Sequence, residues 1–251
     1  MRVDSTLFYL SLIPESGCYG EIAGSEALHA SKSRRLIVGD HLYLMDGKGT
    51  MALARILDQS PHDEILKIQV EETEYIPSPR PRLTLASAIA KGDRQSALLG
   101  MSVQMGMNHY TPLECERSVV RYTPNMQQRW NKIILQSCKQ CRQPYLPILG
   151  QPMTLEKLYE SKREPVSKGA CVIIAGDPDG KSLDSMNLSN PLHLEEIILM
   201  IGPEGGFSSS EKQFLNDQKI LKLCLSDHIL RIETAAVAAC AAVHQHIISK
   251  R

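Results

Sequence analysis

The sequence has no net charge and no apolar run long enough to span a membrane. Its 28 Lys and Arg residues balance its 28 Asp and Glu residues, which argues against a protein that holds nucleic acid through overall charge. The nearest candidate for a span, residues 235–248, is too short and is interrupted by two histidines and a glutamine. No small-residue cleavage site follows the opening segment. We therefore expect a soluble, cytoplasmic protein with no membrane partner.

Several catalytic signatures are also missing. Neither G-x-G-x-x-G nor the phosphate-loop pattern occurs, which disfavours nucleotide-dependent oxidoreductases. Hydrolytic and metal mechanisms have little support, because H-E-x-x-H and G-x-S-x-G are absent too. The seven cysteines are an odd number and fit reduced thiols better than disulfides. Cys138 and Cys141 form the one close pair, late in a predicted helix, so we expect helix packing there and no metal.

The first part of the chain has the pattern of short strands. Residues 41–45 and 65–70 alternate between apolar and polar side chains, and residues 51–57 form a returning strand after a glycine-containing turn. This pattern predicts a small β-barrel. Three alternate prolines between residues 77 and 81 then forbid both helix and strand pairing, which indicates a stiff linker. We therefore predict a first domain over residues 1–75.

The second part, residues 82–251, is predicted to be an α/β domain. Continuous apolar runs at 170–176, 196–202 and 220–225 are each followed by a loop or a helical pattern. Such runs are typical of a largely parallel sheet covered by helices on both faces. Positive charge also collects here: residues 81–251 hold 20 basic against 16 acidic residues, whereas the preceding residues hold 8 against 12.

The strongest local signal is IGPEGGFSSSE, residues 201–211, directly after a buried strand. Its glycines let the backbone turn sharply, and Ser208 with Glu211 forms a capping box that begins a helix. Ligands of open α/β sheets bind at the carboxyl ends of strands, where this loop falls. Glu204 would repel a phosphate, whereas a cationic or neutral ligand such as S-adenosylmethionine (SAM) would tolerate it. An ordinary glycine turn before a capped helix is the simpler alternative.

The second signal is the segment 225–243, where a strand ends and an alanine-rich helix begins. Arg231 lies near the start of that helix, where the helix dipole disfavours a cation. We therefore expect a partner for its guanidinium, and Glu233 is the local candidate. Arg231 either forms a structural ion pair or donates to a substrate oxygen. The small side chains of the helix suit close packing against another helix, including one from a second subunit.

A third feature is a basic stretch over residues 117–142 that contains no acidic residue. On the helix predicted near 126–142, three cations share one face with Gln136, while the apolar side chains lie largely on another. These cations are Arg129, Lys132 and Lys139. The face could follow RNA phosphates, although a merely solvated face is the alternative.

Taken together, these segments resemble a known family. KGDRQSALLGMSVQMGMNHYTPLECERSVV, RWNKIILQSCKQC, IGPEGGFSSSE and ILRIETAAVAA occur in the order and spacing of the bacterial 16S ribosomal RNA uridine N3-methyltransferases of the SPOUT class, the RsmE family. The likeness spans nearly the whole chain. It implies a SPOUT-type parallel sheet with a C-terminal trefoil knot, preceded by a small PUA-like β-barrel that binds RNA. It also implies a homodimer that uses SAM and acts on 16S ribosomal RNA or the small ribosomal subunit.

The resemblance also implies which residues form the site. For SAM, held mainly by backbone groups, they are Ile201, Gly202, Pro203, Glu204, Gly205, Gly206, Leu225, Ser226, Ile229, Leu230 and Thr234. For RNA we expect Arg2, Arg34, Arg35, Arg117, Arg129, Lys132 and Arg142. Arg231, in the motif ILRIETA, matches the residue that contacts the uridine. Uridine N3 must lose its proton before it attacks a methyl group, so Arg231 would stabilise the resulting charge, and Glu204, Glu233 or water would accept the proton.

Some positions depart from the family pattern. The helix segment that usually carries Lys and Glu reads SVQMG here, residues 102–106, and Leu225-Ser226 replaces Leu-Gly before the last loop. These changes affect RNA contacts and helix packing more than the cofactor loops. They support one alternative, a non-catalytic RNA-binding or ribosome-associated protein that keeps the fold, and calorimetry with SAM would separate the two functions.

Overall fold

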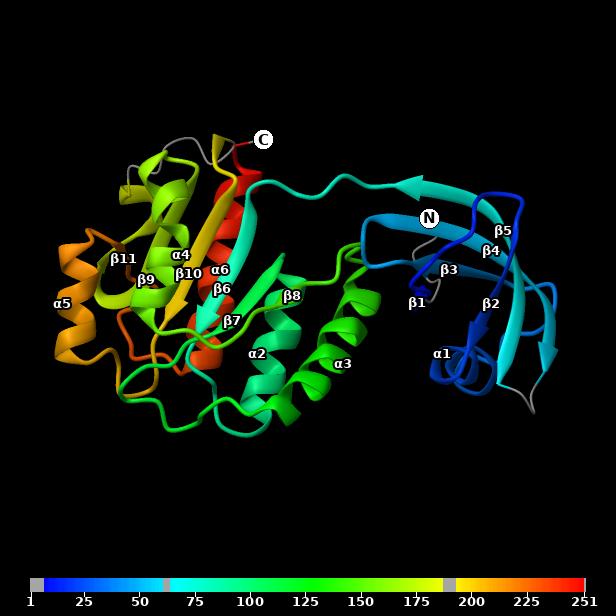
Figure 1. Ribbon diagram of the computed structural model, residues 1–251, viewed down its shortest axis with the longest axis horizontal. Coiled ribbons are helices and arrows are strands. Elements are labelled where there is room, and N and C mark those ends of the chain that lie inside the picture. The colour runs from blue at the N-terminus through cyan, green and yellow to red at the C-terminus, as the bar shows by residue number, and fades with distance from the viewer. Residues whose placement is uncertain (1–6, 61–63, 187–192, 251) are drawn as a thin grey trace. The chain divides into compact units, whose positions relative to one another are not determined.

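The structure is a computed structural model, and it describes residues 7–60, 64–186 and 193–250. Figure 1 shows its helices and strands in chain order. Within these ranges, no helix combines the length and the apolar character that a bilayer crossing requires.

The predicted parallel sheet is present and has six strands. Their order is β11-β9-β10-β6-β7-β8, and every neighbouring pair is parallel. The strands are β6 (Arg82–Ser87), β7 (His109–Pro112), β8 (Ile148–Leu149), β9 (Cys171–Lys181), β10 (Glu196–Ile201) and β11 (Leu221–Leu223). All six residues of β10 are buried, as expected for a strand with both faces covered.

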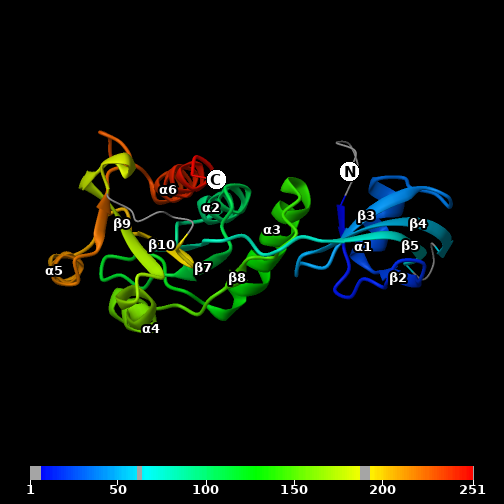
Figure 2. The same cartoon turned by 90° about the horizontal axis from the view of Figure 1, so that it is seen from above.

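Helices cover both faces of this sheet. Helices α2 (Asp93–Gln104) and α6 (Ile232–Ile248) pack together on one face, and α4 (Leu155–Ser167) packs on β9 from the other (Figure 2). Helix α5 (Ser209–Asp217) joins β10 to β11, and the short helix η2 (Leu183–Ser185) follows β9. The connection from β11 to α6 starts at the edge of the sheet and ends on a helix that packs against β10 and β6. It therefore passes the loop that leaves β10.

A second, smaller sheet contains the N-terminal strands in the order β1-β3-β4-β5-β2. These are β1 (Leu7–Tyr9), β2 (Tyr19–Ala23), β3 (His41–Met45), β4 (Thr50–Ser60) and β5 (Ile65–Tyr75), with helices α1 (Ser25–Leu28) and η1 (His29–Ser33). All pairs are antiparallel except β1 with β3. The three predicted strand segments are therefore confirmed. Alternate side chains form its core, including Phe8, Leu42, Leu44, Ile56, Leu66 and Ile68.

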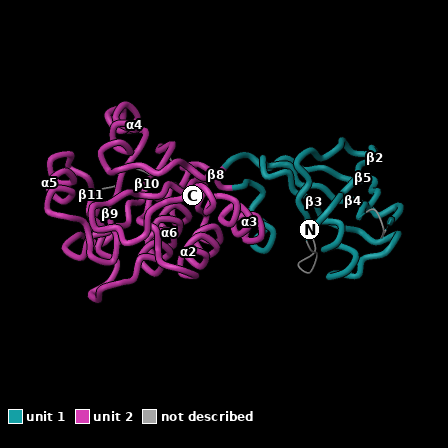
Figure 3. The backbone as a smooth tube through the Cα atoms, turned by 60° about the horizontal axis from the view of Figure 1, so that its bottom comes forward, with its two compact units in different colours: residues 1–78, 138–146 teal, residues 79–137, 147–251 magenta. Residues whose placement is uncertain are grey.

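The chain divides into two compact units (Figure 3). The first contains residues 1–78 and 138–146, and the second contains residues 79–137 and 147–251. Helix α3 (Pro124–Cys141) contributes its last residues to the first unit. Residues 138–146 lie within the predicted second domain, 82–251, but they fold with the N-terminal sheet.

Candidate active site

Two loops of the second unit meet at the carboxyl edge of the parallel sheet. The first loop, residues 202–208, leaves β10, and the second loop, residues 224–231, leaves β11. Together with Gly176–Pro178 of β9 they line a cavity of about 270 Å³, a size suited to a small molecule. All of the predicted SAM-binding residues line it except Thr234. The structure therefore brings together two segments that are separated by α5 and β11 in the sequence.

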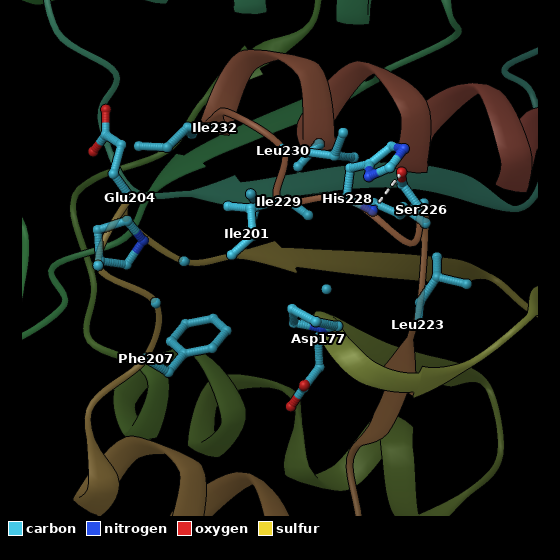
Figure 4. Close-up of a pocket in the computed structure, with 18 of the residues that line it drawn as sticks. Asp177, Ile201, Glu204, Phe207, Leu223, Ser226, His228, Ile229, Leu230 and Ile232 are labelled. Atoms are coloured by element: carbon cyan, nitrogen blue, oxygen red, sulfur yellow. Dashed lines mark hydrogen bonds between the residues drawn. The ribbon is translucent and has the colours of Figure 1, made fainter.

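The cavity wall is largely apolar side chain and loop backbone. Figure 4 shows the ring of Phe207 facing the cavity, with Ile201 and Leu230 also on its walls. The carboxylate of Glu204, in contrast, points away from the cavity. Phe207 and the β9 residues were not among the predicted cofactor contacts. Only Phe207 had a local signal, as an aromatic side chain directly after the Gly205-Gly206 pair.

The backbone of the first loop is shaped by its glycines. Gly206 has a φ of 67°, in the left-handed region that favours glycine. At Gly202, a β-carbon would lie 3.2 Å from the Phe207 ring, so glycine there allows the aromatic ring to pack on the backbone. The predicted capping box is confirmed: Ser208 Oγ accepts from Glu211 N, and the Glu211 carboxylate accepts from Ser208 N at 2.7 Å.

A neighbouring loop, residues 113–118 after β7, anchors the first loop from outside. The Arg117 guanidinium donates to the Gly205 carbonyl oxygen at 2.8 Å. Glu211 is buried, and its second carboxylate oxygen accepts from Glu116 N at 2.9 Å. Ser210 Oγ donates to the Glu116 carboxylate at 2.5 Å, and this bond is the main cause that lowers the pKa of Glu116. The first loop is thus fixed by charged hydrogen bonds.

Charged side chains from three segments meet beside the first loop. Arg94, at the start of α2, lies 4.0 Å from Glu204 and 3.9 Å from Glu233. The Oε2 atom of Glu233 is buried and has no hydrogen-bond partner among the described residues. Arg231 is exposed at the N-cap of α6 and has no ion pair in the described ranges. The expected pairing of Glu233 with Arg231 is therefore wrong, because Glu233 faces Arg94 instead.

A buried polar cluster supports the turn that carries Arg94. Gln95 accepts from Ala90 N at 2.9 Å and donates to the Tyr110 hydroxyl at 2.9 Å. Ser87 Oγ lies 3.2 Å from the same hydroxyl. Burial raises the pKa of Tyr110 to about 12, against the opposing effect of these two hydrogen bonds. Tyr110 therefore stays neutral and can both donate and accept, which fixes the path of the chain from β6 into α2.

The predicted RNA-binding residues occupy different environments. Arg34, Arg35 and Lys132 are exposed, as a phosphate contact requires. Arg142 is partly buried and has a φ of 60°. Arg2 lies outside the described residues.

Two other basic residues already have acidic partners. Arg129 pairs with Asp93 at 3.0 Å and also donates to Ser96. Lys139 was expected on the same polar helix face, but its side chain is 5% exposed and lies 2.7 Å from Glu26. Burial in the first unit removes Lys139 from any surface that RNA could reach. Within the described ranges, no group of His, Cys, Asp and Glu side chains could hold a metal ion.

Comparison with known proteins agrees with this architecture. The chain is 26% identical to the ribosomal RNA small subunit methyltransferase E of Mycobacterium bovis, over 94% of this chain and 90% of that protein. It is 28% identical to the Rickettsia conorii protein of the same name, over 89% and 88%. A putative methyltransferase from Legionella pneumophila, solved in complex with the bound cofactor SAM, matches with a TM-score of 0.83 and 26% identity over 97% of this chain and 98% of that one.

A probable rRNA-methyltransferase from Porphyromonas gingivalis matches with a TM-score of 0.80 and 25% identity, over 98% of this chain and 100% of that chain. The predicted fold class is confirmed: a SPOUT-type parallel sheet with a C-terminal trefoil knot, preceded by a small PUA-like β-barrel. The sequence profile described as "RNA methyltransferase domain" matches residues 77–244. The chain belongs to this RNA methyltransferase family.

Proposed function

We propose that this protein transfers the methyl group of SAM to N3 of a uridine in 16S ribosomal RNA. The observation that carries the proposal is the cavity built from the first and second loops, since these are the two motifs of the predicted cofactor site. Relatives over most of the chain are named as small-subunit ribosomal RNA methyltransferases. The Legionella pneumophila relative was solved with bound SAM. The family match favours an enzyme over a non-catalytic RNA-binding protein.

The residues of the cavity fit SAM. Apolar side chains such as Phe207, Leu225 and Leu230 suit the adenine and the aliphatic carbons, and the backbone of the first loop offers amide and carbonyl groups. The Glu204 carboxylate points outward, so it does not occupy the cavity. When bound, SAM supplies an electrophilic methyl group.

The chain's own residues would then act on the uridine. N3 loses its proton, its electron pair forms the new bond to the methyl carbon, and the pair of the broken carbon–sulfur bond stays on sulfur. Arg231 would donate to a carbonyl oxygen next to N3 and stabilise the negative charge there. Glu233 is the better placed proton acceptor of the two candidates, because its Oε2 atom has no partner in the described ranges. Arg34, Arg35 and Lys132 would contact RNA phosphates. The protein would act as a homodimer, and it would do so in the cytoplasm.

Mass spectrometry of 16S ribosomal RNA from cells with and without the protein tests this function. We expect one N3-methyluridine to disappear when the gene is deleted and to return when purified protein and SAM are added to the unmethylated small subunits. Binding of SAM by calorimetry without any methyl transfer would favour the non-catalytic alternative.

A further inference from the structure

Arg94 stands where three separate segments of the active site converge. It is the second residue of α2, and the turn before it leaves β6 at the same carboxyl edge as the first and second loops. Its guanidinium lies between Glu204 of the first loop and Glu233 at the start of α6. Glu204 lines the cavity through its backbone, whereas its carboxylate points outward toward Arg94, so Arg94 lies just outside the cavity, beside the first loop.

The hydrogen-bond donors of Arg94 are unused. Distances of 3.9 and 4.0 Å to the two carboxylates are too long for hydrogen bonds, and Arg94 makes none with the described residues. A guanidinium has five N–H groups. The other arginines of this edge differ, because Arg117 donates to Gly205 and Arg129 donates to Asp93. Arg94 is therefore oriented by charge and still able to donate.

The surroundings keep Arg94 in place and exposed on one side. Its side chain is 44% exposed, whereas that of Glu233 is 12% exposed. Gln95, the next residue, is buried and bonded to Ala90 N and Tyr110, which fixes the backbone on which Arg94 is carried. A donor held in position before the reaction costs no reorganisation when charge develops.

We propose that Arg94 is a further catalytic residue, which donates to one of the two uracil carbonyl oxygens. This inference rests on the proposed function. Removing the N3 proton spreads negative charge over both oxygens that flank N3, and one arginine can serve only one of them well. Arg231 would serve one oxygen and Arg94 the other. The carboxylates of Glu204 and Glu233 orient Arg94, and the N3 proton goes to Glu233 or to water.

The test compares Arg94→Ala with wild-type protein on two substrates. These are small subunits reconstituted with 16S RNA transcribed from UTP or from 5-fluoro-UTP, since fluorine at C5 lowers the pKa of N3–H. We expect Arg94→Ala to lower the rate of transfer by about a hundredfold on uridine, with an unchanged Kd for SAM. On 5-fluorouridine the ratio of wild-type to variant rate is smaller, because the charge needs less stabilisation. Arg163→Ala removes an exposed arginine of α4 that pairs with Glu160 and serves as the matched control.

The outcomes separate this inference from the proposed function. If wild-type protein methylates neither RNA at N3, the proposed function fails. If wild-type protein is active and Arg94→Ala matches it, or is equally impaired on both substrates, Arg94 has no role in stabilising the uracil charge. If Arg94→Ala does not fold, Arg94→Lys is compared with wild-type protein on the same two substrates. We expect a partial defect, because an ammonium keeps the charge but lacks the planar fork of donors.

Discussion

The first and second loops line the same cavity but are held very differently. The first loop is fixed by Arg117 on Gly205, by the capping box and by the buried Glu211 carboxylate. Residues 225–230 of the second loop make no hydrogen bond to another segment in the described part of the chain; His228 N donates only to Ser226 Oγ within the loop. Ile229 lines the cavity although its side chain is 88% exposed.

This difference indicates how the site works. A loop fixed by charged hydrogen bonds presents its backbone groups already in place, at no entropic cost on binding. A loop with an exposed apolar side chain and few hydrogen bonds belongs to the least stable parts of a fold. We infer that the first loop is a preformed wall and that the second loop is ordered when SAM binds, covering the cofactor with Ile229 and bringing Arg231 into position.

The largest expected effect comes from the second loop. Arg231→Ala should lower the rate of methyl transfer by about 10²–10³-fold, the range for losing one donor to a developing oxyanion. The Kd for SAM should stay unchanged, because Arg231 does not line the cavity. Single-turnover transfer to unmethylated small subunits, with calorimetry on the same samples, measures both quantities. Transfer at the wild-type rate would remove Arg231 from the mechanism.

Hydrogen exchange tests the contrast between the loops directly. Some amides can exchange only when SAM is not bound. At a SAM concentration of about 100 Kd, the free energy of opening rises by roughly 2.7 kcal/mol for these amides, so their exchange slows about a hundredfold. We expect this gain at residues 225–230 and little change at 202–208, which are protected beforehand. Equal gains in the two loops would mean that the first loop is not preformed.

Much of this site could be predicted from the sequence because its signals are local. A glycine-rich turn after an apolar strand, and Ser208 three residues before Glu211, can be recognised without knowing the fold. Gly176–Pro178 could not be predicted, since they reach the cavity only because β9 lies between β10 and β11. The position of Arg94 depends equally on three distant segments.

Helical periodicity has a similar limit. It groups Lys139 with Arg129 on one polar face of a helix, but it does not determine what packs against that face, and the structure buries Lys139 while Arg129 stays exposed. Glu26, more than a hundred residues away in the chain, covers Lys139 and pairs with it.

Arg117→Ala tests the anchoring of the first loop. The variant loses a charged hydrogen bond to the Gly205 carbonyl, which is typically worth about 1.5–3 kcal/mol, so we expect the Kd for SAM to rise about tenfold or more. Arg121→Ala is the matched control, because Arg121 is exposed on the same connection and has no partner in the described ranges. If SAM affinity holds while the salt dependence of RNA binding falls, Arg117 is an RNA contact, as the sequence predicted.

The smallest effect concerns the helix that follows the first loop. Ser208→Ala removes the acceptor for Glu211 N, and such a cap is worth about 1 kcal/mol of unfolding free energy. The Glu211 carboxylate would keep its bonds to Ser208 N and Glu116 N, because both are backbone donors, so SAM affinity should change little. Urea unfolding measures the loss, with Ser209→Ala as the control, since Ser209 is exposed in the first turn of α5 and makes no side-chain hydrogen bond in the described part. A large loss of SAM affinity in Ser208→Ala would show that the cap, rather than Arg117 and Glu211, determines the shape of the first loop.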